Sequence, residues 1–339
     1  MPGASSPAVV LLVASLAATT PALSLAATEP TPLLQIQDPT LLETSGLAVS
    51  ALHEGVLWTH ADGGAAAEVR AFDAAGETVA TVTLAGIDPY DPEALAPGVN
   101  DAGKPALFLG DLGDNLERRP DVSVFRFTEP RRLADQSVEA TWFRFTYSDG
   151  PHDAEALLVH PRTGRMLIAT KDAGGGGVYA GPRDPVPVNQ GTNRLVRVAD
   201  APLLVTDGAY LPDGRFVLRT YGSVLVYDRP GHQVGTASLP LQPQGESVAA
   251  DGDRLLVGSE GPQSAVYAVP VPAPSSDSAP GDRATAPPVD REPGGSVAAS
   301  GNGLGEESGW RTAYRVARVV AIILVLTGVI AYFRRSRRR

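Results

Sequence analysis

The chain has 339 residues, no cysteine and a formal net charge of −10. Eight arginines and no acidic residue follow Trp310, so the rest of the chain carries 20 basic residues against 38 acidic ones. A surface of that sign excludes nucleic acid as a partner, because binding to phosphates requires basic side chains that displace counterions. An acidic surface of this kind is compatible with binding of cations or basic partners, or it serves only to keep the protein soluble. Without cysteine, a secreted domain of this sequence is stabilised by its core and not by disulfide bonds.

Residues 1–27 have the pattern of a signal peptide. The apolar run over 8–18 is too short to span a bilayer, and Ser24, Leu25 and Ala26 place small residues where signal peptidase cleaves. No Lys or Arg precedes the run, so a retained N-terminal anchor is the alternative. Arg outnumbers Lys, and Ala, Gly and Pro are abundant, which indicates a GC-rich bacterial gene of actinobacterial type.

Residues 31–272 contain a short motif that recurs five times: an acidic residue followed by the small and apolar residues that begin a strand. The acidic residues are Glu43, Glu93, Glu155, Asp207 and Glu246, and they lie 39 to 62 residues apart. A second apolar run with a polar end follows each of them. A unit of about 40 to 50 residues built from short strands is the period of a β-propeller blade. The repeats predict an all-β fold, a five-bladed β-propeller, with a six-bladed one as the alternative.

Further strands with period-2 alternation complete the predicted blades, for example 78–84 and 122–127. Turn sequences such as Pro212-Asp213-Gly214 separate them. The last unit offers three strands, ending at 265–269, while residues 33–36 have no partner in their own unit. We therefore expect residues 33–36 to complete the last blade and close the ring, which leaves no exposed sheet edge there.

The chain beyond the repeats predicts a stalk and an anchor. Residues 273–310 are rich in Pro, Ser, Ala and Gly and are expected to be a disordered linker. Residues 316–333 are apolar except for Arg318 and predict one transmembrane helix, with a basic amphipathic surface helix as the alternative. The basic tail 334–339 stays cytoplasmic, so the prediction is a single-pass protein of the cell membrane with an extracellular propeller.

In a propeller blade the start of the first strand and the end of the second meet at one mouth of the central channel, and polar residues recur at both places here. The predicted ligand-binding set is Glu43, His60, Asp62, Glu93, Asp111, Asp114, Asn115, Glu155, Lys171, Asp172, Asp207, Arg219, Glu246 and Glu260. Crowded carboxylates repel one another unless a cation intervenes. The predicted metal ligands are Glu43, Glu93, Glu155, Asp207 and Glu246. Oxygen-rich clusters suit Ca²⁺ or Mg²⁺, and Ca²⁺ is the candidate cofactor, although no motif requires it.

Three roles are open for these residues. Hydrogen bonding to the backbone of a neighbouring blade comes first, since recurrence in every blade favours a structural role. A ligand or cation site comes second and catalysis third, because no motif establishes a reaction.

The stretch 110–115 resembles part of a calcium loop but lacks the bidentate Glu, so we expect a polar turn. His152, beside Asp153, is a candidate base, and residues 174–177 predict a flexible hairpin tip.

Four blade-entry phrases carry a resemblance to a known group of proteins: Glu43-Thr-Ser-Gly-Leu-Ala, Asp91-Pro-Glu-Ala-Leu-Ala, His152-Asp-Ala-Glu-Ala-Leu and Gln244-Gly-Glu-Ser-Val. They resemble secreted bacterial propellers of the esterase-like or phytase-like group and, more distantly, gluconolactonase and NHL-repeat propellers. The resemblance covers about residues 33–271. It implies a channel mouth whose carboxylates hold calcium and act on phosphate esters or lactones.

Two functions follow as hypotheses. The first is a membrane-anchored extracellular propeller that binds a ligand or an envelope protein. The second is a calcium-dependent hydrolase of the phosphoesterase or lactonase type that works at the channel mouth.

Overall fold

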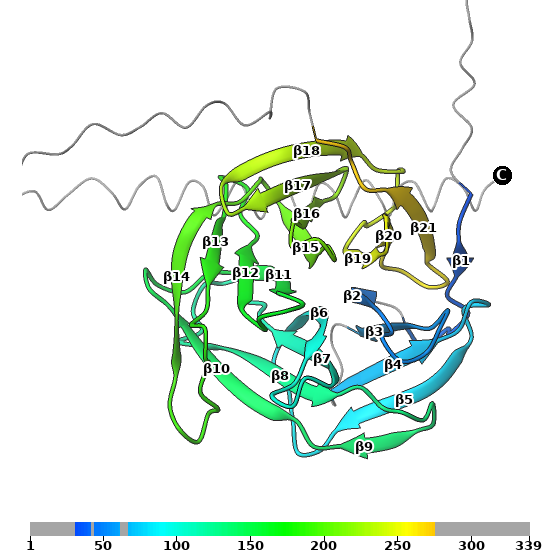
Figure 1. The fold of residues 1–339 in the computed structure, drawn as a ribbon, viewed down its shortest axis with the longest axis horizontal. Coiled ribbons are helices and arrows are strands. Elements are labelled where there is room, and N and C mark those ends of the chain that lie inside the picture. The colour runs from blue at the N-terminus through cyan, green and yellow to red at the C-terminus, as the bar shows by residue number, and fades with distance from the viewer. Residues whose placement is uncertain (1–30, 42–43, 62–66, 275–339) are drawn as a thin grey trace, which may run out of the picture. The chain divides into compact units, whose positions relative to one another are not determined.

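The computed structural model describes residues 31–41, 44–61 and 67–274, which form 21 β-strands and no helix (Figure 1). The predicted signal peptide, transmembrane segment and basic tail, and the stalk beyond residue 274, lie outside these residues. Among the described residues no helix is long and apolar enough to cross a membrane. The described fold is a β-propeller, with its sheets arranged around a common axis.

The strands of the described residues fall into five groups of four, in which successive members pair in antiparallel fashion. Group 1 contains β2 (Thr44–Val49), β3 (Leu57–Ala61), β4 (Glu68–Phe72) and β5 (Thr78–Leu84). Group 2 contains β6 (Pro92–Val99), β7 (Pro105–Asp111), β8 (Val122–Thr128) and β10 (Thr141–Tyr147). Group 3 contains β11 (Ala154–Val159), β12 (Met166–Thr170), β13 (Gly177–Ala180) and β14 (Asn193–Asp200). Group 4 contains β15 (Val205–Tyr210), β16 (Phe216–Thr220), β17 (Ser223–Arg229) and β18 (His232–Ser238). Group 5 contains β19 (Ser247–Asp251), β20 (Arg254–Gly258), β21 (Ala265–Pro270) and β1 (Leu34–Gln35).

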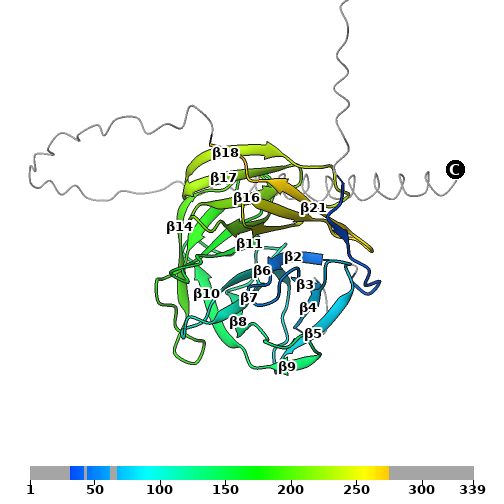
Figure 2. The ribbon, with the colours of Figure 1, turned by 45° about the vertical axis from the view of Figure 1, so that its right-hand side comes forward.

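The first strands of the groups make a closed ring of contacts. β2 contacts β6, β6 contacts β11, β11 contacts β15, β15 contacts β19, and β19 contacts β2 again. Figure 1 looks along the axis of this ring, and in Figures 1 and 2 the strands β5, β9, β14 and β18 lie at its outer edge. The acidic motif therefore recurs because each group supplies one inner strand.

The apolar core lies between the groups. Each of the five clusters of buried side chains joins two successive groups, and the cluster between groups 5 and 1 completes the circle. Trp58 and Phe125 pack between groups 1 and 2, and Phe143 and Ile168 between groups 2 and 3. Full burial of one such side chain stabilises the fold by about 1.5–3 kcal/mol. Each group is therefore stabilised mainly by its neighbours.

The N-terminal strand β1 pairs with β21, the pairing expected for residues 33–36. Leu34 lies opposite Val266 and Gln35 opposite Ala265, in antiparallel register. Leu34 and Ile36 are buried in the cluster that joins groups 5 and 1. The strand covers the outer edge of β21 and attaches the start of the domain to its end.

Two outer pairings were not predicted. β14 runs parallel to β10 and joins groups 2 and 3 into one eight-stranded sheet. The buried Asn193 supports this junction, because its Nδ2 donates to Arg144 O at 3.1 Å and its Oδ1 accepts from Val186 N at 2.8 Å. β9 (Gln136–Val138) adds in parallel to β5, outside group 1. The longest interval between acidic motifs runs from Glu93 to Glu155, and β9 with its connections accounts for the extra residues in it.

Candidate functional site

Strand pairing brings the start of each inner strand and the end of the second strand to one face of the ring. Pro92 lies opposite Asp111, Ala154 opposite Thr170, and Ser247 opposite Gly258. We call this the mouth face. The acidic residues within two positions of these inner-strand starts are buried, with 7% of Glu93 and of Glu155, 1% of Asp207 and 4% of Glu246 exposed. Glu43 and Asp62 lie outside the described residues.

Three members of the predicted set, from groups 3 and 5, meet at the mouth face. Lys171 Nζ forms an ion pair with the carboxylate of Glu155 and lies 4.0 Å from Glu246 Oε2. The ring of Tyr221, from the β16–β17 connection, lies 5.2 Å from Lys171 Nζ. Glu155, Lys171, Glu246 and Tyr221 are called the acidic cluster below.

The acidic cluster has more carboxylates than cations, and its pKa shifts reflect that. Burial raises the pKa of Glu155 well above its usual value, Lys171 opposes the shift, and Glu246 adds to it. Burial lowers the pKa of Lys171, but the carboxylates of Glu155 and Glu246 outweigh burial and raise it. Glu155 therefore holds its proton more tightly mainly because it is buried, and Lys171 does so because two carboxylates lie close to it.

Glu246 is the least satisfied member of the cluster. It is 4% exposed, and its carboxylate makes no hydrogen bond to another described residue; its ion pair with Lys171 is at the long distance of 4.0 Å. Buried carboxylates are normally hydrogen-bonded, since burying a charge without compensation is costly. The Arg219 guanidinium also attracts Glu246 electrostatically. No described donor makes a hydrogen bond to the Glu246 carboxylate, so it can accept one from a ligand.

Asp207 and Arg219, by contrast, hydrogen-bond to the backbone around them. Asp207 Oδ1 accepts from Gly208 N and Oδ2 accepts from Val248 N of the next group, both at 2.7 Å. Burial raises the pKa of Asp207, and these two bonds oppose the shift. Arg219 is fully buried and donates to the carbonyls of Ser247 and Gly258. Burial lowers the pKa of Arg219 to about 10. These two side chains join groups 4 and 5.

The aspartates at the end of β7 and just after it shape a loop. Asp111 Oδ1 accepts from Asp91 N at 2.9 Å and pairs with Arg119 at 2.8 Å. Asp114 Oδ2 accepts from Arg119 N at 2.7 Å, and Asp114 N donates to Asp153 Oδ1 at 2.9 Å. The loop is the polar turn expected for residues 110–115, and it is tied to the start of group 3.

The remaining predicted residues are dispersed over the mouth face. Asn115 is exposed, and Asp172 Oδ1 accepts from Gly174 N at 2.7 Å in the hairpin expected for residues 174–177. Glu260 contacts Gln244, and His60 is buried at the end of β3. Their backbone positions lie on one face of the ring, and these side chains do not form one group.

Sequence reasoning missed Tyr221, Arg119 and Ser45. Ser45 Oγ donates to Glu93 O at 2.9 Å across groups 1 and 2. Tyr221 directly follows β16, so the rule that selected the polar ends of second strands would have found it, had aromatic residues been admitted. No local signal marks Arg119, because its partners are brought to it by the fold of the loop.

A metal site stays a prediction. Within residues 31–41, 44–61 and 67–274, no three or more His, Cys, Asp or Glu side chains gather in a way that could hold a metal ion. In this part of the chain Glu155 is bound to Lys171 and Asp207 to backbone N–H groups. Glu43, the fifth predicted ligand, lies outside it.

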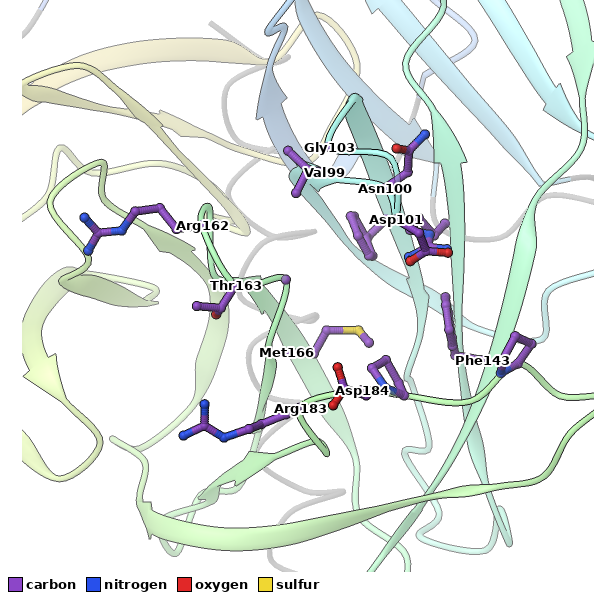
Figure 3. Close-up of a pocket in the computed structure, with 15 residues that line it drawn as sticks. Val99, Asn100, Asp101, Gly103, Phe143, Arg162, Thr163, Met166, Arg183 and Asp184 are labelled. Carbon is purple, nitrogen blue, oxygen red and sulfur yellow. The ribbon is translucent and has the colours of Figure 1, made fainter.

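A cleft of about 530 Å³ opens on the opposite face, between groups 2 and 3 (Figure 3). Arg126 makes two hydrogen bonds of 2.6 Å to Asp101 at its wall and lies over the ring of Phe143. Met166 and Thr163 line the side that faces Asp101 in Figure 3. No residue of the predicted set lines this cleft.

No protein-family model and no curated protein matches this sequence. Similar solved structures include a gluconolactonase from Xanthomonas campestris, with 19% identity, a TM-score of 0.42, and 68% of this chain and 72% of that chain covered. A second protein assigned as a gluconolactonase has 13% identity and a TM-score of 0.40, with 74% and 95% covered. A chain of a nidogen/laminin complex has 11% identity and a TM-score of 0.38, with 64% and 72% covered. Likeness at this level gives no information about the activity of this chain.

Proposed function

We propose that this chain is a membrane-anchored extracellular propeller of five blades whose channel mouth binds a positively charged ligand. The observation that carries the proposal is Glu246, a buried carboxylate that accepts no hydrogen bond from another described residue and shares Lys171 with Glu155. A ligand cation would supply the missing donor. A hydrogen bond to a charged group is worth about 1.5–3 kcal/mol, which corresponds to roughly a ten- to hundredfold change in affinity.

The charge of the chain and of the cluster agree on the sign of the ligand. The chain has a net charge of −10, and the acidic cluster holds two carboxylates and one ammonium group. Such a surface raises the local concentration of cations and repels anions. Because Lys171 is already bound to Glu155, Glu246 is the group that we assign to contact the ligand.

The blade count and the anchor are parts of the same proposal. The closed ring of five inner strands and the pairing of β1 with β21 support five blades. The patterns of residues 1–27, 273–310, 316–333 and 334–339 support export, a stalk, a single membrane span and a cytoplasmic tail. An extracellular module with one anchor and a long stalk suits binding at the cell envelope.

The test uses the full chain in detergent and n-butylammonium, which carries the charged group of a lysine side chain. Isothermal titration at constant ionic strength should show binding to the natural chain and an affinity at least about tenfold weaker for Glu246→Gln. Glu54→Gln, an exposed residue in the β2–β3 hairpin on the opposite face, makes the same charge change and should bind as the natural chain does. Equal affinity of the natural chain and Glu246→Gln would refute the proposal.

A hydrolase is the second candidate, and the raised pKa of Glu155 favours it. A buried carboxyl group whose pKa is raised well above its usual value is a candidate general acid, particularly with a lysine beside it. The assay is turnover of p-nitrophenyl phosphate and of glucono-δ-lactone, with Ca²⁺ and with a chelator. A Ca-dependent hydrolase predicts turnover that chelation and Glu155→Gln both abolish. Absence of turnover on both substrate classes in the presence of Ca²⁺ speaks against it.

A further inference from the structure

We infer that the mouth face is a docking surface for a protein segment in which a lysine or arginine is flanked by apolar side chains. The inference rests on the proposed function, since the basic residue would occupy the acidic cluster. It adds the class of partner, which follows from the side chains around the cluster.

Exposed apolar side chains are more frequent in the connections that reach the mouth face than in those on the opposite face. In the described part of the chain, six of the ten exposed large hydrophobic residues lie there: Tyr90, Leu116, Leu203, Leu204, Tyr221 and Leu241. Leu241 is 98% exposed and Tyr90 is 77% exposed. The hairpins on the opposite face hold one described counterpart, Leu52. These six residues are called the apolar rim.

Tyr221 and the Leu203–Leu204 turn are the part of the apolar rim that adjoins the acidic cluster. Tyr221 belongs to both, because its ring lies 5.2 Å from Lys171 Nζ. Leu204 N donates to Asp172 O at 3.2 Å, which places the Leu203–Leu204 turn beside the residue that follows Lys171. A buried charged centre beside aromatic and apolar side chains is the arrangement of many protein–protein interfaces.

Backbone strain supports a functional role for the same connections. The non-glycine residues with left-handed backbone in the described part are Glu117, Leu204 and Gln263, with φ of 51°, 54° and 53°. All three lie in connections on the mouth face, and two of them are in the rim or next to it. Such a conformation is uncommon for residues other than glycine and is concentrated at functional sites.

Charge complementarity selects the occupant. Carboxylates at the centre repel nucleic acids and anionic lipid headgroups, and they attract ammonium or guanidinium groups. A free small cation would leave the leucines of the rim exposed to water. A polypeptide segment with one basic side chain and apolar residues on both sides satisfies both parts of the surface.

The test measures fluorescence anisotropy of a labelled peptide, Leu-Phe-Lys-Leu-Val, with the full chain in detergent. We expect the natural chain to bind it, and expect the double variant Leu203→Ser with Leu241→Ser to bind it at least tenfold more weakly. Both positions are exposed, so these changes should not affect folding. Leu52→Ser, on the opposite face, is the matched control and should bind as the natural chain does.

Two further peptides and the butylammonium titration separate this inference from the proposed function. Replacement of lysine by norleucine should abolish binding, and replacement of the flanking residues by serine should weaken it at least tenfold. Equal binding of the serine-flanked peptide, together with Glu246-dependent binding of butylammonium, overturns the docking surface but not the cation site. If the natural chain does not bind butylammonium, both the docking surface and the cation site are overturned. Self-association that the double variant abolishes, without peptide binding, overturns the inference in favour of a second copy of the chain.

Discussion

At the residue scale, acidic residues at equivalent positions have different partners. Asp207 and Glu246 both occur at the mouth-face end of an inner strand, but Asp207 bonds to two backbone N–H groups and Glu246 bonds to none among the described residues. Aspartate is shorter by one methylene, so its carboxylate stays near its own backbone and that of the next group. Glutamate extends further, and Glu155 and Glu246 reach Lys171.

Asp207→Ala should lower the free energy of unfolding by about 3 kcal/mol. The change leaves Gly208 N and Val248 N buried without an acceptor, and each such group costs about 1–3 kcal/mol. Glu246→Gln removes a poorly paired buried charge and should leave stability unchanged or raise it. Urea unfolding of both variants checks the contrast. A large loss for Glu246→Gln would assign it the same structural role as Asp207.

The affinity for butylammonium should rise with pH beyond the range in which an ordinary glutamate titrates. Because the pKa of Glu155 is raised, its charge develops above the usual value of 4.5, and a cation binds the ionised form better.

The same shift in the pKa of Glu155 means that the folded state holds the proton more tightly than the unfolded one. The contribution of Glu155 to stability therefore falls as pH rises from 4.5 through the raised pKa.

Titrations between pH 5 and 8 check this dependence. Glu155→Gln should give a flatter profile of affinity against pH, and Glu54→Gln should keep the natural one. An affinity that is constant above pH 5 in the natural chain would show that Glu155 ionises normally.

At the scale of the element, a two-residue strand closes the ring with help from one glycine. Gly76 has a φ of +83°, and a Cβ there would lie 1.9 Å from Gln35 O. Gln37 N donates to Gly76 O at 2.8 Å, so β1 is held between β21 and the β4–β5 hairpin. Glycine is required both for the backbone conformation and for the close approach of β1.

Gly76→Ala should destabilise the domain by at least about 2 kcal/mol more than Gly86→Ala. Both glycines have positive φ, so both variants carry a backbone cost of about 1 kcal/mol. A Cβ at Gly86 meets nothing within 4 Å, whereas a Cβ at Gly76 displaces β1. Urea unfolding gives the difference, and hydrogen exchange at Leu33 N, which bonds Val266 O, locates it. Equal losses in the two variants would mean that β1 contributes little.

At the scale of the whole molecule, the groups depend on one another. Every apolar cluster is shared between two groups, and the ring of inner strands returns to its start. The β10–β14 pairing adds a second link between groups 2 and 3. One face of this ring carries the acidic cluster and the apolar rim, and the other carries the cleft between groups 2 and 3.

The full chain should fractionate with membranes and resist extraction by alkaline carbonate. The apolar residues 316–333 are long enough for a single span, and the basic tail 334–339 favours a cytoplasmic C-terminus. A chain that ends at residue 310 should appear in the soluble exported fraction. Recovery of the full chain in the soluble fraction would refute the anchor and leave the mouth-face proposals untouched.

The strands, their order and the faces to which their ends run could be predicted from the sequence. Period-2 alternation, turn residues and a recurring acidic motif are local features, and a repeated unit must place equivalent residues at equivalent positions. The partner of residues 33–36 could also be predicted, because the last unit lacked a fourth strand.

The roles of the acidic residues could not be predicted from the sequence, since Asp207 and Glu246 have similar sequence settings and different spatial neighbours. Tertiary structure alone placed Tyr221 over Lys171, added β9 beside β5 and paired β10 with β14. These are contacts between groups, whose distances depend on how the groups pack and not on any short stretch of chain.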